Sequence, residues 1–345
     1  MKGFNKRECE QDSYVHGKQD FNMSQNRPFD DILDLIETMP TLNEGKRHDL
    51  TKKMEEVCGH LSPLGRLCPD LANIAAWQDR EVPSLSRPLI AVFAGTHGVS
   101  DGVFGSDIIE ASKARVKSLT EGKVAVRGMA ADLGSAYKVY EFGIEHPSAN
   151  FTKEASLSER DCAAAIAFGM EVVAEGADVI VLGNAGYGAA TAGAAIAKAL
   201  FGGASDYWAG GTEKGAQARI KAVEEGAKRH NREDTPSPLE ILRDYGGRDI
   251  AGLVGAILAA RHQRIPVILD GYVVCTAAAV LHRINPATLD HCIAAQVSIE
   301  PAHQALLDRL DLTPIVDLKI NIGDGTGGAF ALSVLKTAAA GLTSL

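Results

Sequence analysis

One carboxylate flanked by glycines has the setting of a catalytic group. Asp324 stands in the run GDGTGG (323–328), near the C-terminal end of the sequence. Glycines on both sides would let a ligand approach the backbone closely, and the carboxylate could then act as a general base. A helical pattern follows over 329–341, and Asp caps helices well, so a helix N-cap is an equally good local interpretation of Asp324.

A second glycine-rich segment could bind phosphate. The run GNAGYGAAT (183–191) follows an apolar run and precedes a helical pattern, so its backbone N–H groups could cradle an anion at a helix N-terminus. It lacks the Gly-Lys-Ser/Thr ending of a P-loop, and Thr191 stands where a dinucleotide fingerprint has glycine or alanine. A tight turn without a ligand is the alternative.

Two further polar residues follow apolar runs. His97, in AGTHGVSDG (94–102), could be a base, a ligand or a buried loop histidine. We predict no metal site, because no second His or Cys stands at metal-ligand spacing. Asp270 either binds a ribose or other substrate group or caps the end of a strand, and we favour binding. A Ser-His-Asp hydrolase is disfavoured because the G-x-S-x-G elbow is missing.

Buried strands and amphipathic helices alternate through most of the chain and must position these groups. Short apolar runs, typical of strands buried on both faces, are PLIAVFAG (88–95), ADVIVLGN (177–184), IPVILDGYVV (265–274) and TPIVDLKINIG (313–323). Helical patterns cover 159–176, capped by Ser158, 190–200, 215–230, 237–246, with a capping box from Ser237 to Glu240, and 249–264. This alternation predicts an α/β fold with an open, mostly parallel, Rossmann-like sheet, whose ligand site lies beyond the carboxyl ends of the strands.

Composition excludes several function classes. The 345 residues carry 35 Lys and Arg against 44 Asp and Glu, a net charge of −9, so we expect no nucleic-acid partner. No apolar stretch approaches the length of a membrane span, and the first residues lack the apolar core of a secretory signal, so we expect a cytoplasmic protein. The six cysteines form no C-x-x-C pair, which disfavours zinc and disulfides. Residues 1–27 lack apolar periodicity and are predicted to be a disordered arm.

Several motifs occur together in an order that resembles one known family. They are PLIAVFAGTHGV (88–99), SPLGRL (62–67), LSERDCAAAIAFGM (157–170), GGRDIAGLVGAILAARHQRIPVILDGY (246–272), SIEPAHQALL (298–307) and IGDGTGGAFAL (322–332). They resemble nicotinate-nucleotide:dimethylbenzimidazole phosphoribosyltransferases over about residues 28–342. The resemblance implies a homodimer and a large α/β domain, here 88–289. It also implies a small helical domain from both chain ends, 28–87 with 290–345, whose 313–328 loop reaches the active site.

The resemblance also implies a reaction that needs no metal or cofactor. Nicotinate mononucleotide donates its phosphoribosyl group to a nitrogen of 5,6-dimethylbenzimidazole, which releases nicotinate and gives α-ribazole 5′-phosphate for the lower ligand of cobalamin. In the family a glutamate of the C-terminal glycine loop removes the azole proton, and Asp324 matches it here. The shorter side chain withdraws the carboxylate by one methylene, and a misplacement of about 1 Å can cost roughly a hundredfold in rate.

Other positions of the resemblance are changed too. Asn184 stands where the family usually has a glutamate, Thr96 where it has an aspartate, and Arg219 where it has a lysine, with Lys221 two residues on. An amide cannot accept a proton, although it can hydrogen-bond a ribose hydroxyl. On this basis the predicted substrate-binding residues are Thr96, His97, Gly183, Asn184, Gly186, Tyr187, Gly188, Thr191, Arg219, Asp270, Gly271, Gly323, Gly325 and Thr326.

The changes leave other functions open. Residues 117–128 replace a glycine- and alanine-rich stretch of the family, and the azole-pocket residues expected around 103–110 are not recognisable, so we predict a remodelled azole pocket. A catalytically weak or silent paralogue that binds a nucleotide or aromatic base in a regulatory or partner role is the main alternative. A hydrolase or transferase of another nucleoside phosphate is the third possibility.

Overall fold

Five parallel strands form one open sheet at the centre of the chain. The computed structural model describes residues 27–58, 64–101, 107–122, 124–211 and 215–342. The strands are β1 (Pro88–Gly95), β2 (Ala136–Phe142), β3 (Val179–Asn184), β4 (Val267–Leu269) and β5 (Cys292–Ala294), in the spatial order β2-β1-β3-β4-β5. All four strand pairs are parallel, so the carboxyl ends of the strands share one edge of the sheet. The predicted α/β class is confirmed.

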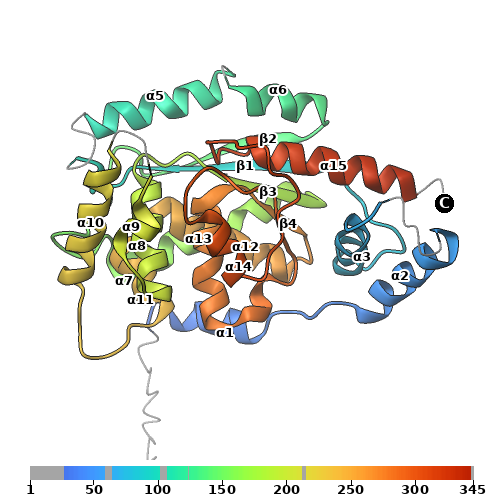
Figure 1. Ribbon diagram of the computed structural model, residues 1–345, viewed down its shortest axis with the longest axis horizontal. Helices are drawn as coiled ribbons and strands as arrows, with labels where there is room; N and C mark the ends of the chain where they lie inside the picture. Colours follow the sequence, from blue (N-terminus) through green and yellow to red (C-terminus); the bar gives the residue numbers. More distant parts are fainter. Residues whose placement is uncertain (1–26, 59–63, 102–106, 123, 212–214, 343–345) are drawn as a thin grey trace, which may run out of the picture.

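Helices cover both faces of this sheet (Figure 1). On one face, α1 (Asp30–Glu37), α7 (Glu159–Met170), α8 (Ala189–Phe201), α11 (Pro238–Tyr245), α12 (Arg248–His262) and α13 (Gly271–Ile284) contribute to a large apolar core. On the other, α2 (Glu44–Cys58), α3 (Leu67–Trp77), α6 (Ala125–Asp132) and α15 (Thr326–Leu342) contribute to a second core. The remaining helices are α5 (Ile108–Thr120), α9 (Ser205–Ala209), α10 (Ala216–Arg229) and α14 (His303–Arg309), with 3₁₀ turns at Glu171–Glu175 and Pro286–Leu289.

The burial and the length of each strand decide whether the sequence reveals it. Every residue of β1 and β3 is buried, as their continuous apolar runs predict. The edge strand β2 alternates between exposed and more buried residues along AYKVYEF, so no continuous apolar run marks it in the sequence. With only three residues, β5 is too short to leave such a run.

Two predicted strands are wrong wholly or in part. Residues 313–323, all described, form no strand and make a single bridge from Val316 to Gln296. The segment contains charged side chains, and Lys319 has a φ of 56°, which a strand does not allow. In the run 265–274 only β4 is a strand, because the chain turns into α13 at Gly271, where φ is +86°.

The helix predictions are confirmed with small shifts of their ends. The Ser158 side chain caps α7 by accepting from the Asp161 N–H, and α7 passes into the 3₁₀ turn at Met170. The capping box between Ser237 and Glu240 opens α11 as predicted. The pattern over 329–341 belongs to α15, which begins three residues earlier, directly after the glycine loop.

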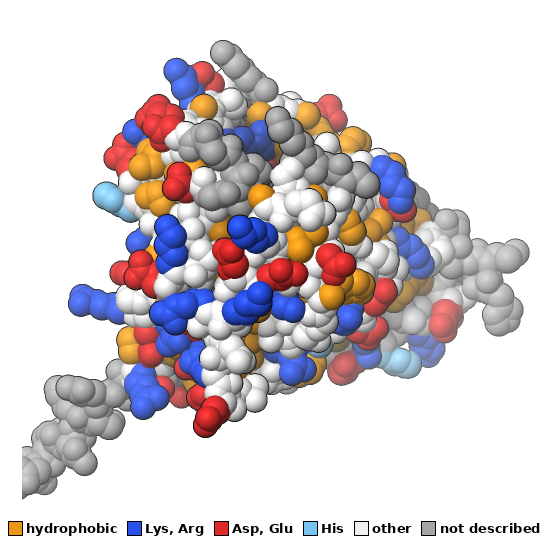
Figure 2. Space-filling view, turned by 60° about the vertical axis from the view of Figure 1, so that its left-hand side comes forward, with side chains coloured by type: hydrophobic (Ala, Val, Ile, Leu, Met, Phe, Trp, Pro, Cys, Tyr) orange, Lys and Arg blue, Asp and Glu red, His pale blue; other side chains and the backbone are white. Residues whose placement is uncertain are grey.

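The C-terminal helix lies on the same face of the sheet as the second and third helices. The C-terminal helix α15 packs against α3, α6, β3 and β4, so it joins the early helices to the sheet (Figure 1). The division into domains at 28–87 with 290–345 and at 88–289 stays a prediction, and the predicted arm lies, except for its last residue, outside the described residues. Within the described part of the chain, none of the helices combines the length and the apolar character needed to span a bilayer. On the face that Figure 2 presents, basic and acidic side chains alternate over short distances.

Candidate functional site

The glycine-rich turns gather at one edge of the sheet, as predicted. The Asn184 N–H donates to the Gly323 carbonyl over 2.7 Å, and the Gly325 N–H donates to Asp270 Oδ2 over 2.8 Å. The Tyr187 N–H donates to the Gly95 carbonyl over 2.9 Å. These bonds tie the ends of β1, β3 and β4 to the loop before α15, so they form one rim.

Glycine is required where two of these turns cross. A Cβ on Gly183 would lie 2.4 Å from the Gly325 nitrogen, closer than van der Waals contact allows. Gly325 itself has a φ of +95°, which disfavours any other residue. The close packing of backbone on backbone therefore fixes the loop against the end of β3.

A cavity of about 570 Å³ opens on this rim. Seven of the predicted site residues line it, namely Asn184, Gly186, Tyr187, Gly188, Asp270, Gly271 and Gly323. Its other walls come from α5 (Ala111, Ala114, Arg115, Ser118), from the turn before α8 and its first residues (Ala185, Ala189, Ala190), from α13 (Tyr272, Val273) and from the C-terminal segments (Ser298, Glu300, Asn321, Ile322). A cavity of this size accommodates a ligand as large as a nucleotide.

Some lining residues were missed in the sequence. Ser298 and Glu300 lie within the quoted run SIEPAHQALL, so their motif was available as a signal although no role was assigned to them. Arg115 comes from the middle of a charged helix, where nothing in the pattern distinguishes it from its neighbours. The predicted azole segment 103–110 lies partly outside the described residues; within it, Asp107 caps α5.

Asp324 lies directly behind the cavity wall. Its side chain is 3% exposed, and Oδ2 lies 2.9 Å from Nη2 of Arg115, which lines the cavity and is 31% exposed. Oδ1 accepts from Thr326, over 2.6 Å from the hydroxyl and 3.3 Å from the N–H. Asp324 thus satisfies the first turn of α15, as the helix-cap interpretation expects, and it also stands one side chain away from the ligand space.

Asp270 anchors the glycine loop from below. Its carboxylate is fully buried and accepts from Gln296 Nε2 over 2.7 Å and from the Gly325 N–H over 2.8 Å. Burial raises the pKa of Asp270 to about 7, the hydrogen bonds from Gln296, Gly328 and Gly325 oppose the rise, and the charge of Asp324 adds to it. Both oxygens have partners within the protein, and neither makes a cap bond at the start of α13, so the carboxylate holds the glycine loop and the ribose contact stays a prediction.

Asn184 and His97 share a buried carboxylate that the sequence did not single out. Asn184 Nδ2 donates to Asp249 Oδ2 over 2.8 Å, and His97 Nε2 lies 2.9 Å from Asp249 Oδ1. Burial would raise the pKa of Asp249, but His97 and the hydrogen bonds outweigh it and hold the pKa below its ordinary value. His97 is 1% exposed, so of its three interpretations the structure favours the buried loop histidine.

Three more predicted binding residues lie away from the cavity lining. The Thr96 hydroxyl donates to the Ile144 carbonyl over 2.8 Å. Thr191 is buried in α8. Arg219 is buried in α10, where Nη2 donates to the Gly210 carbonyl and Nη1 lies 3.7 Å from Glu300, a cavity residue. Arg219 therefore reaches the site through Glu300.

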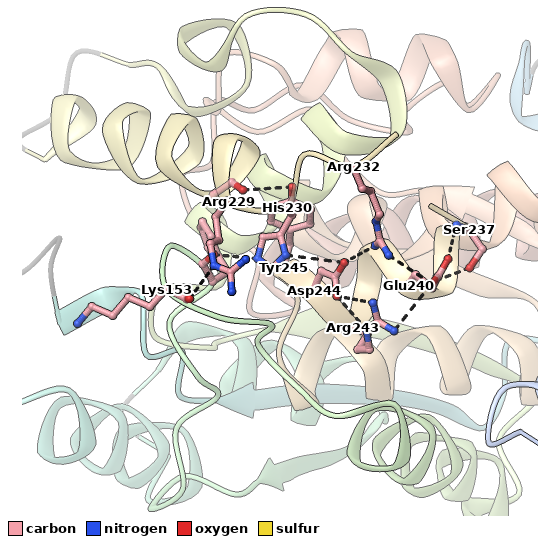
Figure 3. Close-up of polar contacts among 11 residues, drawn as sticks. Lys153, Arg229, His230, Arg232, Ser237, Glu240, Arg243, Asp244 and Tyr245 are labelled. Atoms are coloured by element: carbon pink, nitrogen blue, oxygen red, sulfur yellow. Dashed lines mark hydrogen bonds and ion pairs between the residues drawn. The ribbon is translucent and has the colours of Figure 1, made fainter. Parts of the chain in front are cut away.

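A different polar cluster joins α10 and α11 (Figure 3). Asp244 is 4% exposed at its side chain and pairs with Arg232 over 2.6 Å and with Arg243 over 2.7 Å. His230 Nδ1 lies 3.9 Å away, and Arg232 also reaches Glu240, the capping-box residue. The Asp244 carbonyl accepts from the Ser156 N–H, which fixes the loop before α7. We call this set the Asp244 cluster.

The residues described contain no group of three or more His, Cys, Asp or Glu side chains placed to hold a metal ion. The polar groups at the rim include backbone N–H groups, the Asn184 amide, and the carboxylate of Asp324 with its partner Arg115. Such a set can bind an anionic ligand and hold a proton acceptor near it.

Comparison with known proteins identifies relatives along nearly the whole chain. Residues 39–345 match a family model described as "Phosphoribosyltransferase". A nicotinate-nucleotide–dimethylbenzimidazole phosphoribosyltransferase of Brucella melitensis biotype 2 is 41% identical over 318 residues, which cover 90% of this chain and 93% of that protein. The protein of that name from Brucella anthropi is 40% identical with the same coverage.

Solved structures share the fold. A crystal structure of the phosphoribosyltransferase of this name from Thermus thermophilus superposes with a TM-score of 0.73 at 27% identity, covering 89% of this chain and 94% of that chain. A structure described as CobT, from the same organism, gives a TM-score of 0.72 at 26% identity, covering 89% and 95%.

Proposed function

The chain belongs to the nicotinate-nucleotide:dimethylbenzimidazole phosphoribosyltransferase family, and from that premise we propose that it transfers phosphoribosyl from nicotinate mononucleotide to 5,6-dimethylbenzimidazole or a related base. The observation that carries the proposal is the cavity at the rim. It is bounded by the glycine turn that opens α8 and by the glycine loop that holds Asp324. The nucleotide and the acceptor would meet between these two turns.

The rim supplies an anion site at the start of α8. The aligned peptide dipoles add positive potential at the start of a helix. At the start of α8 the N–H groups of Ala189 and Thr191 donate to the carbonyls of Gly186 and Gly188, so this potential carries the assignment. Gly188, with a φ of +91°, brings the chain into α8 beside the cavity. We assign the phosphate or the carboxylate of the nucleotide to this end of the cavity.

The acceptor chemistry is assigned to Asp324. Its carboxylate takes the proton of one azole nitrogen while the other nitrogen bonds to the anomeric carbon of ribose. The bond from that carbon to the pyridine nitrogen breaks, and its electron pair leaves with nicotinate. Positioned general bases contribute about 10²- to 10⁴-fold in rate. Arg115 stands between Asp324 and the cavity, so the guanidinium must rotate aside or bind together with the acceptor.

One observation favours the alternative of binding without turnover. Both oxygens of Asp324 are already occupied, by Arg115 and by Thr326. A silent paralogue would keep the nucleotide site and lose the base in this way. The homodimer and the cytoplasmic location rest on the family and on the sequence respectively, and both stay predictions.

Product analysis separates transfer from binding. Purified protein is incubated with nicotinate mononucleotide and a panel of azoles and phenols, and nicotinate and new nucleotides are separated by chromatography and identified by mass. We expect nicotinate release matched by one ribotide of an azole. Saturable nucleotide binding with no release for any acceptor would instead establish the silent paralogue.

A further inference from the structure

The Asn184 amide, at the nucleotide end of the cavity, is held from behind by a buried carboxylate that lies against the His97 ring. Asp249 is 0% exposed and receives the Asn184 amide at one oxygen and lies against His97 at the other. A Cβ on Gly186 would lie 2.1 Å from Asp249 Oδ2, and a Cβ on Gly247 would lie 2.3 Å from the His97 ring. The backbone is therefore closed tightly around the pair, so neither side chain can change its place.

This environment fixes the direction of the Asn184 amide. An ionised carboxylate only accepts hydrogen bonds, so the nitrogen of the amide must face Asp249. The amide oxygen accepts from the Gly186 N–H over 2.9 Å, which agrees with that direction. An amide nitrogen carries two hydrogens, and Asp249 takes one. The second hydrogen can be donated to a ligand, because Asn184 lines the cavity beside the first turn of α8.

We propose that Asp249, braced by His97, is a positioning residue that presents the second N–H of Asn184 to an anionic oxygen of the nucleotide substrate. The inference rests on the proposed function, because the substrate is the nucleotide assigned there. The amide adds a side-chain donor to the positive potential of the helix start. A carboxylate at position 184 would present only acceptors and would stand against Asp249, where two like charges repel each other.

Exchanging the two side chains separates positioning from packing. In Asn184→Asp two carboxylates meet, and we expect a lower melting temperature and nicotinate mononucleotide binding weakened at least about tenfold, as for a lost hydrogen bond to a charged group. In the double variant Asn184→Asp with Asp249→Asn, the hydrogen bond re-forms with donor and acceptor exchanged. The melting temperature should then recover while the binding stays at least about tenfold weak, because an oxygen now faces the cavity.

Binding is measured by titration calorimetry without acceptor, and the melting temperature by calorimetric scanning. Recovery of binding together with stability in the double variant would overturn the inference and reduce the pair to packing. Should the double variant not fold, Asn184→Ala removes the donor without adding charge. Binding equal to that of the wild type in this variant would overturn the inference equally.

Two ligand analogues identify the oxygen. The effect of Asn184→Ala should disappear with the nicotinate riboside if the partner is the phosphate, and with nicotinamide mononucleotide if it is the nicotinate carboxylate. Persistence of the full effect with both analogues would contradict an anionic partner. Asp244→Asn, at a buried carboxylate that pairs with Arg232 and Arg243 and does not line the cavity, is the matched control and should bind the nucleotide as the wild type does. A wild-type chain that does not bind nicotinate mononucleotide would contradict the proposed function itself.

Discussion

Two buried aspartates with arginine partners behave differently in this molecule because of what their arginines face. Asp244 and Asp324 are 4% and 3% exposed, and each lies within 3 Å of a guanidinium nitrogen. Of the two arginines at Asp244, Arg243 belongs to α11 and Arg232 to the segment before it. Both also contact Glu240. Arg115 instead lines a cavity large enough for a nucleotide. A buried carboxylate belongs to a functional site when its arginine partner lines a ligand cavity. It has a structural role when its arginine partners contact other residues of the same cluster.

The largest effect should come from removing Asp324. Asp324→Ala is expected to lower the transfer rate by about 10²- to 10⁴-fold, since the base acts on the acceptor. Nucleotide affinity should change little, because the residue lies behind Arg115. Steady-state rates and calorimetric binding measure the two quantities. Transfer that survives this change would show that another group is the base.

Asp270 gives the stability of the rim a pH dependence. Its folded pKa of about 7 lies above the ordinary value of 3.8, so the folded state holds the proton at pH values where the unfolded state has lost it. The contribution of Asp270 to stability is therefore greatest below about pH 4 and falls as the pH rises to about 7. At about 1.4 kcal/mol per pKa unit, the total reaches up to about 4 kcal/mol.

Asp270→Asn isolates that contribution, because the amide imitates the protonated acid. Gln296 can rotate so that its Oε1, which has no hydrogen-bond partner in the structure, accepts from the new amide. Urea titration measures the free energy of unfolding of both proteins between pH 4.5 and 7.5. As the pH rises, the wild type should lose stability relative to the variant. A difference that stays constant over this range would show that Asp270 is ionised throughout.

The Asp244 cluster should respond in stability and not in catalysis. Asp244→Ala leaves two arginines without their carboxylate, and their side chains are 28% and 21% exposed. We expect a loss of about 2 kcal/mol in the free energy of unfolding, less than the 3–5 kcal/mol typical of a fully buried pair, because water reaches both guanidinium groups. The Michaelis constant of the folded protein for nicotinate mononucleotide should not change. A raised Michaelis constant would extend the functional site to this cluster.

Arg115 should have the smallest effect. Arg115→Met keeps much of the side-chain length and removes the charge beside Asp324, so we expect the turnover number to change by about tenfold, with stability affected little at a side chain 31% exposed. A fall would show that the guanidinium holds the carboxylate in place, and a rise that it obstructs the acceptor. Arg115→Lys, which keeps the charge, should lie between. An unchanged turnover number would show that Arg115 has no part in the reaction.

Much of the fold could be predicted from the sequence because its central strands are buried on both faces. The runs that became β1 and β3 could hardly form another buried element of that length. Edge strand β2 was missed because solvent on one side allows polar residues to alternate with apolar ones. Residues 313–323 were predicted as a strand because local patterns do not show that a segment lies at the end of a sheet and lacks a continuous neighbour.

The site could be predicted in its backbone and only partly in its side chains. Glycines mark close approach of two chain segments, so Gly183, Gly186 and Gly323 identified the rim. The partners of its polar groups come from distant segments: Asp249 lies 65 residues from Asn184, and Arg115 lies 209 residues from Asp324. A carboxylate at position 184 would meet Asp249, a conflict that only the folded structure reveals.

A side-by-side assay of Asp324→Asn and Asp244→Asn, with 5,6-dimethylbenzimidazole as acceptor, tests the comparison most directly. For each variant and the wild type, the rate of nicotinate release from nicotinate mononucleotide and the melting temperature are measured in one buffer. We predict that Asp324→Asn loses at least about a hundredfold in rate and little in melting temperature, while Asp244→Asn loses melting temperature and keeps its rate. The opposite pattern, or equal losses in both variants, would contradict the assignment of the rim as the working site.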